Sequence, residues 1–136
     1  MKAELYQVQY SEFRPDIPMF RAKLYCEYDY QHIATVDLTK CRIRPESPST
    51  FSIMQAYLEK VFKLTNSIEY PWSQNTEVSI APSAKSVRST SVGDVVVLYY
   101  DGYAIPYLCA DNGWWQIPGS DRHATTDVPL WDTFGC

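Results

Sequence analysis

Alternating apolar and polar residues predict strands in the first third of the chain. These strands are expected over residues 3 to 10, 20 to 28 and 32 to 38. In the first of them, Tyr6 and Val8 share one face and Gln7 lies on the other, which is typical of a half-buried strand. We expect the second and third strands to form a hairpin, with a tight turn at residues 29 to 31.

A different period follows, because apolar residues begin to recur at steps of three and four. The residues on this stripe are Phe51, Met54, Leu58, Val61, Phe62 and Thr65. This is a helix period, and we predict one main helix over about residues 48 to 66. Ser47 is the expected N-cap, with Pro48 at the first helical position. Glu59 and Lys63 form a favourable i,i+4 pair on the wet side.

The C-terminal third returns to strand patterns. Strands are expected over residues 78 to 80, 95 to 100, 103 to 110 and 114 to 117. Asp101 and Gly102 form the strongest hairpin signal in the chain, and Pro106 indicates an edge strand or a bulge. One helix between two groups of strands predicts an α+β fold in a single domain over residues 1–136. We expect an antiparallel, strongly bent sheet or a small barrel packed on the helix.

Composition narrows the class of protein. The chain is 46% hydrophobic and 21% charged, which excludes wholesale disorder, and its net charge of -4 argues against sequence-blind coating of DNA. No apolar run approaches the length of a membrane span, and the N-terminal residues lack the apolar core of a signal peptide. We therefore expect a cytoplasmic protein.

The cysteines do not indicate a metal or redox site. Cys26, Cys41, Cys109 and Cys136 contain no C-x-x-C pair, and in a cytoplasmic protein we expect free thiols. The set Cys109, His123, Asp121 and Asp127 matches no standard ligand spacing. No cofactor and no metal are predicted.

Catalysis also lacks a motif. The two histidines are His32, at the edge of a strand, and His123, in a polar turn. An unrecognised hydrolase requires Cys109 or a serine within hydrogen-bond reach of one of these histidines. Neither histidine lies in a nucleophile motif, so we expect no enzyme and keep the hydrolase as a second alternative.

The stretch Arg88-Ser-Thr-Ser91 has two interpretations. It resembles a phosphate-binding segment in offering hydroxyls, amides and a guanidinium, but no glycine-rich turn leads into a helix here. We therefore favour a structural role, in which Arg88 pairs with an acid and the serines satisfy backbone groups at the start of the strand.

Aromatic residues give the best argument for function. They make up 15% of the chain. Because neighbouring strand residues face opposite ways, Tyr99 and Tyr100 must diverge, as must Trp114 and Trp115. One member of each pair can enter the core, and the other is covered by the helix, covered by the C-terminal cluster around residues 128 to 134, or left exposed to bind a protein. The predicted partner-binding residues are Tyr99, Tyr100, Trp114 and Trp115, with Arg88 and Asp101 as rim charges.

A basic cluster supports an alternative function. Lys40, Arg42 and Arg44 lie close together in the sequence, and exposed aromatic residues beside them would suit a small module that binds single-stranded nucleic acid. The neighbouring Glu46 and the overall acidic balance argue against this alternative.

A family resemblance adds a biological setting. The segment Leu58-Glu-Lys-Val-Phe-Lys-Leu-Thr-Asn66, then Trp72, then Arg88-Ser-Thr-Ser-Val-Gly-Asp-Val-Val96, and finally Gly113-Trp114, resembles a pattern in small uncharacterised phage and plasmid proteins of the YodL-like group. The resemblance brings no catalytic residues and implies an accessory protein of a mobile element. Combined with the aromatic residues, it leads us to expect binding to a host or defence protein, as an inhibitor of a host or anti-phage defence system.

Overall fold

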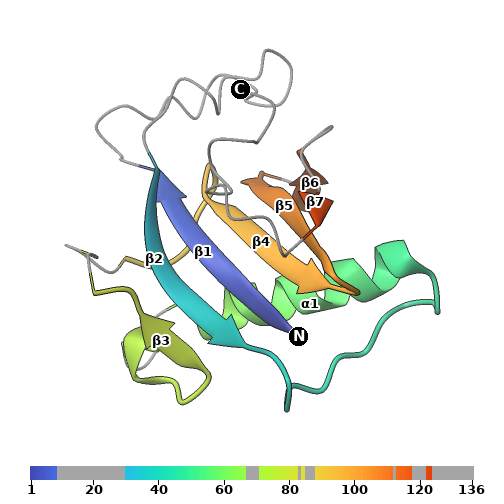
Figure 1. The fold of residues 1–136 in the computed structure, drawn as a ribbon, viewed down its shortest axis with the longest axis horizontal. Coiled ribbons are helices and arrows are strands. Elements are labelled where there is room, and N and C mark those ends of the chain that lie inside the picture. The colour runs from blue at the N-terminus through green and yellow to red at the C-terminus, as the bar shows by residue number, and fades with distance from the viewer. Residues whose placement is uncertain are drawn as a thin grey trace.

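A computed structural model of the chain describes residues 1–8, 30–66, 71–82, 84, 88–111, 113–117 and, for the backbone alone, 122–123. One antiparallel sheet dominates this part of the chain, and the helix α1 (Thr50–Leu64) packs across one face of it (Figure 1). The strands are β1 (Lys2–Val8), β2 (Tyr30–Asp37), β3 (Val78–Ile80), β4 (Val95–Tyr100), β5 (Tyr103–Ala110), β6 (Gly113–Gln116) and β7 (Arg122–His123). A short 3₁₀-helix, η2, covers Trp72–Gln74. The predicted α+β class is confirmed.

The strand order is β3-β2-β1-β4-β5-β6, and β7 pairs with the other end of β5. The N-terminal strand β1 therefore lies in the middle of the sheet, between β2 and β4. The path of described strands is open, with β3 and β6 at its ends, so it forms a bent sheet rather than the closed barrel that was the other expected form. The predicted strand over residues 20 to 28 lies outside the described residues.

In the central strand β1, the face that was expected to be exposed to solvent is buried. Ala3, Leu5 and Gln7 share the face toward α1 and are at most 3% exposed, so the face that was expected to be wet contributes to the interior. The register of β1 against β2 shifts between Leu5 and Tyr6. Tyr30 also belongs to β2 and pairs with Val8, so the turn expected at residues 29 to 31 is wrong at its second and third positions. Long-range pairing with β1 outweighs the local turn signal there.

The helix is confirmed but begins later than predicted. Ser49 is the N-cap, with extended backbone and a side chain that accepts from the amide of Ser52. Pro48 therefore precedes the cap, and Ser47 instead bonds the hydroxyls of Ser49 and Ser52. Two serines with similar capping chemistry stand close together, and sequence alone did not separate them. No described helix is long and apolar enough to cross a membrane.

The C-terminal meander forms as expected, with a tight β4–β5 turn. Asp101 and Gly102 both have positive φ, 49° and 81°, as a two-residue hairpin turn requires. Pro106 does not lie on an edge strand, because β5 pairs with β4 on one side and with β6 and β7 on the other. Its carbonyl accepts from Ile117, so its ring nitrogen also faces that outer side, and β5 loses no bond to β4.

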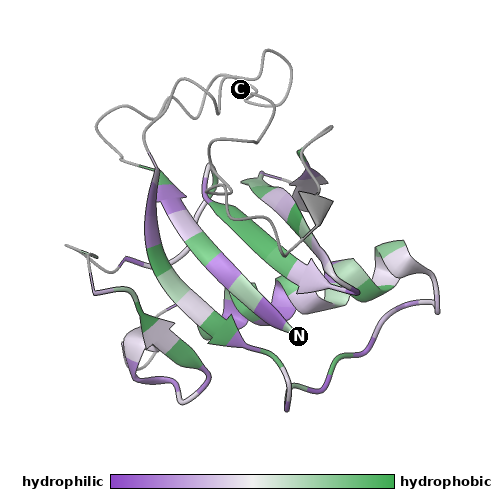
Figure 2. Cartoon of the chain, in the orientation of Figure 1, coloured by the Kyte–Doolittle hydropathy of each residue, from purple (hydrophilic) through white to green (hydrophobic). Residues whose placement is uncertain are grey.

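The sheet carries an apolar cluster on each face. Between α1 and the sheet, the largest buried side chains include Leu5, Ile33, Met54, Leu58, Trp72 and Leu98. The opposite face carries Val95, Val97, Ala104, Leu108 and Ile117. Figure 2 shows the consequence, because β4 is hydrophobic at consecutive residues while β1 alternates. A strand buried on both faces needs apolar residues without alternation.

Candidate binding surfaces

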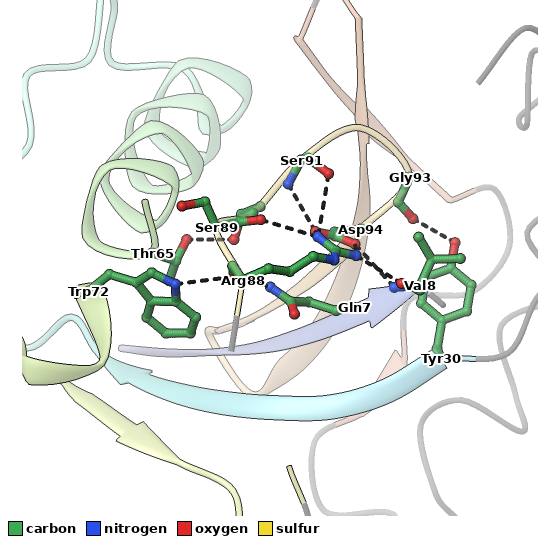
Figure 3. Close-up of polar contacts among 11 residues, drawn as sticks. Gln7, Val8, Tyr30, Thr65, Trp72, Arg88, Ser89, Ser91, Gly93 and Asp94 are labelled. Atoms are coloured by element: carbon green, nitrogen blue, oxygen red, sulfur yellow. Dashed lines mark hydrogen bonds and ion pairs between the residues drawn. The ribbon is translucent and has the colours of Figure 1, made fainter. Parts of the chain in front are cut away.

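Arg88 is half-buried against the start of β4. Its Nη1 and Nη2 each donate to one carboxylate oxygen of Asp94 at 2.7 Å, and Nη2 also donates to the carbonyl of Val8 at 2.8 Å (Figure 3). The amides of Val8 and Ser91 donate to the same carboxylate. Asp94 is 0% exposed. This bidentate ion pair therefore fastens the segment before β4 to the end of β1.

Neighbouring side chains complete the same network. The carbonyl of Arg88 accepts from Nε2 of Gln7 at 2.7 Å and from Nε1 of Trp72 at 3.1 Å. The hydroxyls of Thr65 and Thr90 lie 2.7 Å apart, which links the end of α1 to this segment. Figure 3 shows these groups converging from α1, η2 and β1. Every polar group named here has a partner, as buried polar groups require.

The predicted pairing of Arg88 with an acid is thus confirmed, and the expected bonds from the serine hydroxyls to backbone groups stay a prediction. Burial raises the pKa of the Asp94 carboxyl, while the hydrogen bonds from Arg88, Ser91 and Val8 act in the opposite direction. The side chain of Arg88 is only 23% exposed and its guanidinium holds Asp94. Its expected role as a rim charge is therefore wrong, because the guanidinium is engaged with Asp94.

The two aromatic pairs divide between the faces of the sheet, as strand geometry requires. Tyr100 and Trp114 pack against the cluster beneath α1, whereas Tyr99 packs against the opposite cluster. Trp115 is 43% exposed, and the ring of Trp114 meets the ring of Phe62 edge-on at 6.4 Å. The four predicted anchors therefore do not form one surface. Asp101 is exposed at the tip of the β4–β5 turn.

Glu4 organises a polar cluster on the face of the sheet opposite α1. It accepts hydrogen bonds from the hydroxyls of Tyr99 and Tyr6, and Nε2 of His32 lies 3.4 Å from its Oε2. The ammonium of Lys2 lies 4.6 Å from the ring centre of Tyr99. These contacts join β2, β1 and β4 across adjacent strands. The charged groups of this cluster are engaged with one another.

One flank of α1 is the surface that the sequence did not identify. We define the α1 flank by Phe51, Gln55, Glu59 and Phe62. Phe51 is 73% exposed and Phe62 is 38% exposed, although both were assigned to the buried stripe of the helix. Met54, Leu58 and Val61 are buried as predicted. On a helical wheel the two phenylalanines lie at the margin of that stripe, beside Gln55 and Glu59, and this was the available signal.

Two hollows open along the α1 flank. The N-terminal hollow, about 290 Å³, is lined by Arg44, Pro45, Glu46, Phe51, Ser52, Gln55, Ala56 and Glu59. The C-terminal hollow, about 340 Å³, is lined by Glu59, Phe62, Lys63, Cys109, Ala110, Asp111, Gly113 and Trp114. Glu59 lines both, so the two hollows adjoin at this residue. Trp114 is the one predicted anchor that borders them.

The basic cluster lies in the connection between β2 and α1. Lys40, Arg42 and Arg44 are exposed, and Cys41 and Ile43 between them are half-buried. Arg44 and Phe51 line the same hollow, together with Glu46. The arrangement that the nucleic-acid alternative requires is therefore partly present.

Reactive groups are not assembled in the described part of the chain. Nε2 of His32 bonds the carbonyl of Ala34 and faces Glu4, and no described serine or cysteine bonds this ring. Burial raises the pKa of the Cys109 thiol to about 12. Cys41 is a free thiol, as is Cys109. The His123 side chain, Asp121, Asp127, Cys26, Cys136 and the cluster at residues 128 to 134 lie outside the described residues. Within the described ranges, no group of three or more metal-ligating side chains occurs.

Comparisons with family models, with curated proteins and with solved structures found no match for this chain. The resemblance to YodL-like phage and plasmid proteins therefore stays a prediction.

Proposed function

We propose that this protein acts by binding another protein through the α1 flank and the adjoining β5–β6 turn. One observation carries the proposal: Phe51 and Phe62 are exposed on the same flank of the helix, at the edges of two hollows. Exposed aromatic side chains beside a hollow are typical of interface anchors. Trp114, already expected to contact a partner, borders the same surface.

The sequence resemblance supplies the biological setting of the proposal. A small accessory protein of a phage or plasmid, without an assembled catalytic group among its described residues, suits an inhibitor that blocks a host or anti-phage defence protein by occupying its surface. The proposed partner is therefore a protein of the host cell.

Affinity capture with a matched variant tests the proposal. The full chain and the variant Phe51→Ala/Phe62→Ala are immobilised and exposed to lysates of several bacterial hosts, and retained proteins are quantified by mass spectrometry. We expect a protein retained in stoichiometric amount by the unmodified chain and lost by the variant. Equal thermal stability of the two chains serves as the folding control. If no host yields such a protein, protein binding through this surface is wrong.

A second candidate function is binding of single-stranded nucleic acid by Lys40, Arg42 and Arg44, with a base stacked on Phe51. It is favoured by the shared hollow of Arg44 and Phe51. The test is a titration of a labelled single-stranded oligonucleotide at several salt concentrations, with the triple alanine variant as comparison. Binding that weakens with salt and vanishes in the variant supports this function, and absence of binding at low salt overturns it.

A further inference from the structure

The α1 flank has the dimensions of a site for a second helix. Phe51 and Phe62 are eleven residues apart, which is about three helical turns or roughly 16 Å along the axis. Glu59 lies between them, nearer Phe62, and lines both hollows. The surface thus alternates along its length between apolar anchor, carboxylate and apolar anchor.

The charges along this surface lack ion-pair partners among the residues that the structure describes. The five charged residues lining the two hollows are Arg44, Glu46, Glu59, Lys63 and Asp111. In the described part of the chain none of them makes an ion pair, and the expected bond between Glu59 and Lys63 is absent. Carboxylates outnumber cations here. A positive charge on a partner that covers Glu59 would offset the cost of burying this carboxylate.

We propose that the α1 flank binds an amphipathic helix of a partner protein. This helix carries two apolar side chains about three turns apart, which contact Phe51 and Phe62 and fill the hollows beside them. Between them, and nearer the residue that meets Phe62, it carries a lysine or arginine that pairs with Glu59. The inference rests on the proposed function and adds the chemical class of the partner.

Backbone chemistry favours a helical partner over an extended one. The groups along α1 are bonded within the helix, so the flank offers no row of free amides and carbonyls with which an extended segment pairs. A partner helix brings its own backbone bonds and presents only side chains. Apolar residues recurring over several turns then meet the two hollows, as in other helix-in-groove interfaces.

A displayed peptide library tests this inference directly. Helical peptides of about 18 residues, roughly 27 Å long, carry apolar residues fixed eleven positions apart, with all positions between them randomised. They are sorted against the full chain and against Glu59→Lys. We expect lysine or arginine to be enriched one turn from one fixed apolar residue on the unmodified chain. On Glu59→Lys we expect aspartate or glutamate at that position.

Affinity measurements on the selected peptides locate the contact. We expect Phe51→Ala and Phe62→Ala each to weaken binding by at least about tenfold. Tyr103→Ala, which removes another exposed ring, and Glu77→Lys, which reverses a charge that lines neither hollow, are matched controls expected to change binding less than about twofold. Circular dichroism of the bound peptide is expected to show a helix.

The remaining outcomes separate the two proposals. Selected peptides that bind but are insensitive to Phe51→Ala, Phe62→Ala and Glu59→Lys overturn the helix site and leave protein binding intact elsewhere. Bound peptides without helical structure overturn it too. Concentration-dependent self-association that Phe51→Ala abolishes, measured by light scattering, shows that a second copy occupies the flank and overturns a foreign helix. Failure of both peptide selection and lysate capture overturns both proposals.

Discussion

Polar and aromatic groups are bonded and buried around Arg88, whereas those of the α1 flank are exposed. Inside, Arg88 holds Asp94 with two bonds of 2.7 Å, and the indole of Trp72 is 1% exposed. On the flank, Glu59 has no ion pair among the described residues, and Phe51 is 73% exposed. Both regions adjoin the same helix.

The contrast separates stability from function. The hydrogen bonds of a buried, fully paired carboxylate stabilise the folded state. A raised pKa at Asp94 alone therefore does not mark a functional site. An exposed ring beside an unpaired carboxylate contributes little to folding, which leaves it available for a partner. If this division holds, substitutions around Arg88 lower the free energy of unfolding, and substitutions on the α1 flank leave it nearly unchanged.

The largest effect is expected when the interior pair is broken. Asp94→Ala leaves the guanidinium of Arg88 without its partner and removes the acceptor for the amides of Val8 and Ser91. Loss of one member of a buried ion pair costs about 3–5 kcal/mol of unfolding free energy. Urea denaturation followed by tryptophan fluorescence measures this cost.

A double variant sharpens the interpretation. Arg88→Met combined with Asp94→Leu removes both charges and is expected to cost less than Asp94→Ala alone, because no unpaired charge remains inside. A single variant as stable as the unmodified chain would mean that the pair does not fasten β4, and the contrast between the two regions would fail.

The helix offers a second test, with one residue from each of its sides. Leu58 is 0% exposed and packs between α1 and the sheet, so Leu58→Ala is expected to cost about 2–5 kcal/mol of unfolding free energy. Phe51→Ala removes a larger side chain but is expected to stay within about 0.5 kcal/mol. Chemical denaturation of both variants checks this. A large loss in Phe51→Ala would assign the ring to the core rather than to a partner.

Local patterns predicted most of the described fold. The helix period, the short strand at residues 78–80 and the Asp101–Gly102 turn all follow from neighbouring residues, and all are present. The errors arose where distant residues decide. Gln7 is buried because the carbonyl of Arg88, far along the chain, accepts its amide proton, and no pattern within β1 contains that information.

The candidate surface was predictable only in part. Strand alternation correctly divided Tyr99 from Tyr100 and Trp114 from Trp115, but it did not indicate which face a helix would cover. Phe51 and Phe62 fit the helix period at the margin of the buried stripe, where the period alone does not decide whether a ring is covered or exposed. The hydrophobic period indicates on which face of a helix a side chain lies. It does not indicate how far the sheet extends to cover that face.

Cys109 lies where the two regions meet and provides a chemical test. Its amide donates to the carbonyl of Asp94, and it also lines the C-terminal hollow. Because burial raises the pKa of its thiol to about 12, little thiolate exists at neutral pH. We expect iodoacetamide to modify it more than about tenfold more slowly than an unfolded cysteine peptide at pH 8. Peptide mapping before and after denaturation measures the rate, and rapid modification of the native chain would show a deeper hollow.

The smallest effect is expected on the face of the sheet opposite α1. Tyr99→Phe removes the hydroxyl that donates to Glu4 but keeps the ring beneath the ammonium of Lys2. Glu4 retains Tyr6 and His32 nearby and is partly exposed to solvent, so we expect a loss of about 1 kcal/mol in unfolding free energy.

The matched control for this variant is Tyr57→Phe on α1. The Tyr57 ring packs against the buried cluster, and its hydroxyl has no hydrogen bond within the described residues, so its removal is expected to leave stability unchanged within about 0.5 kcal/mol. Equal effects in the two variants would mean that the Glu4 cluster adds nothing to pairing of β1 with β4. The polar groups on this face would then contribute nothing to folding, as we expect for those of the α1 flank. The α1 flank would no longer be distinguished from the rest of the molecule in this respect.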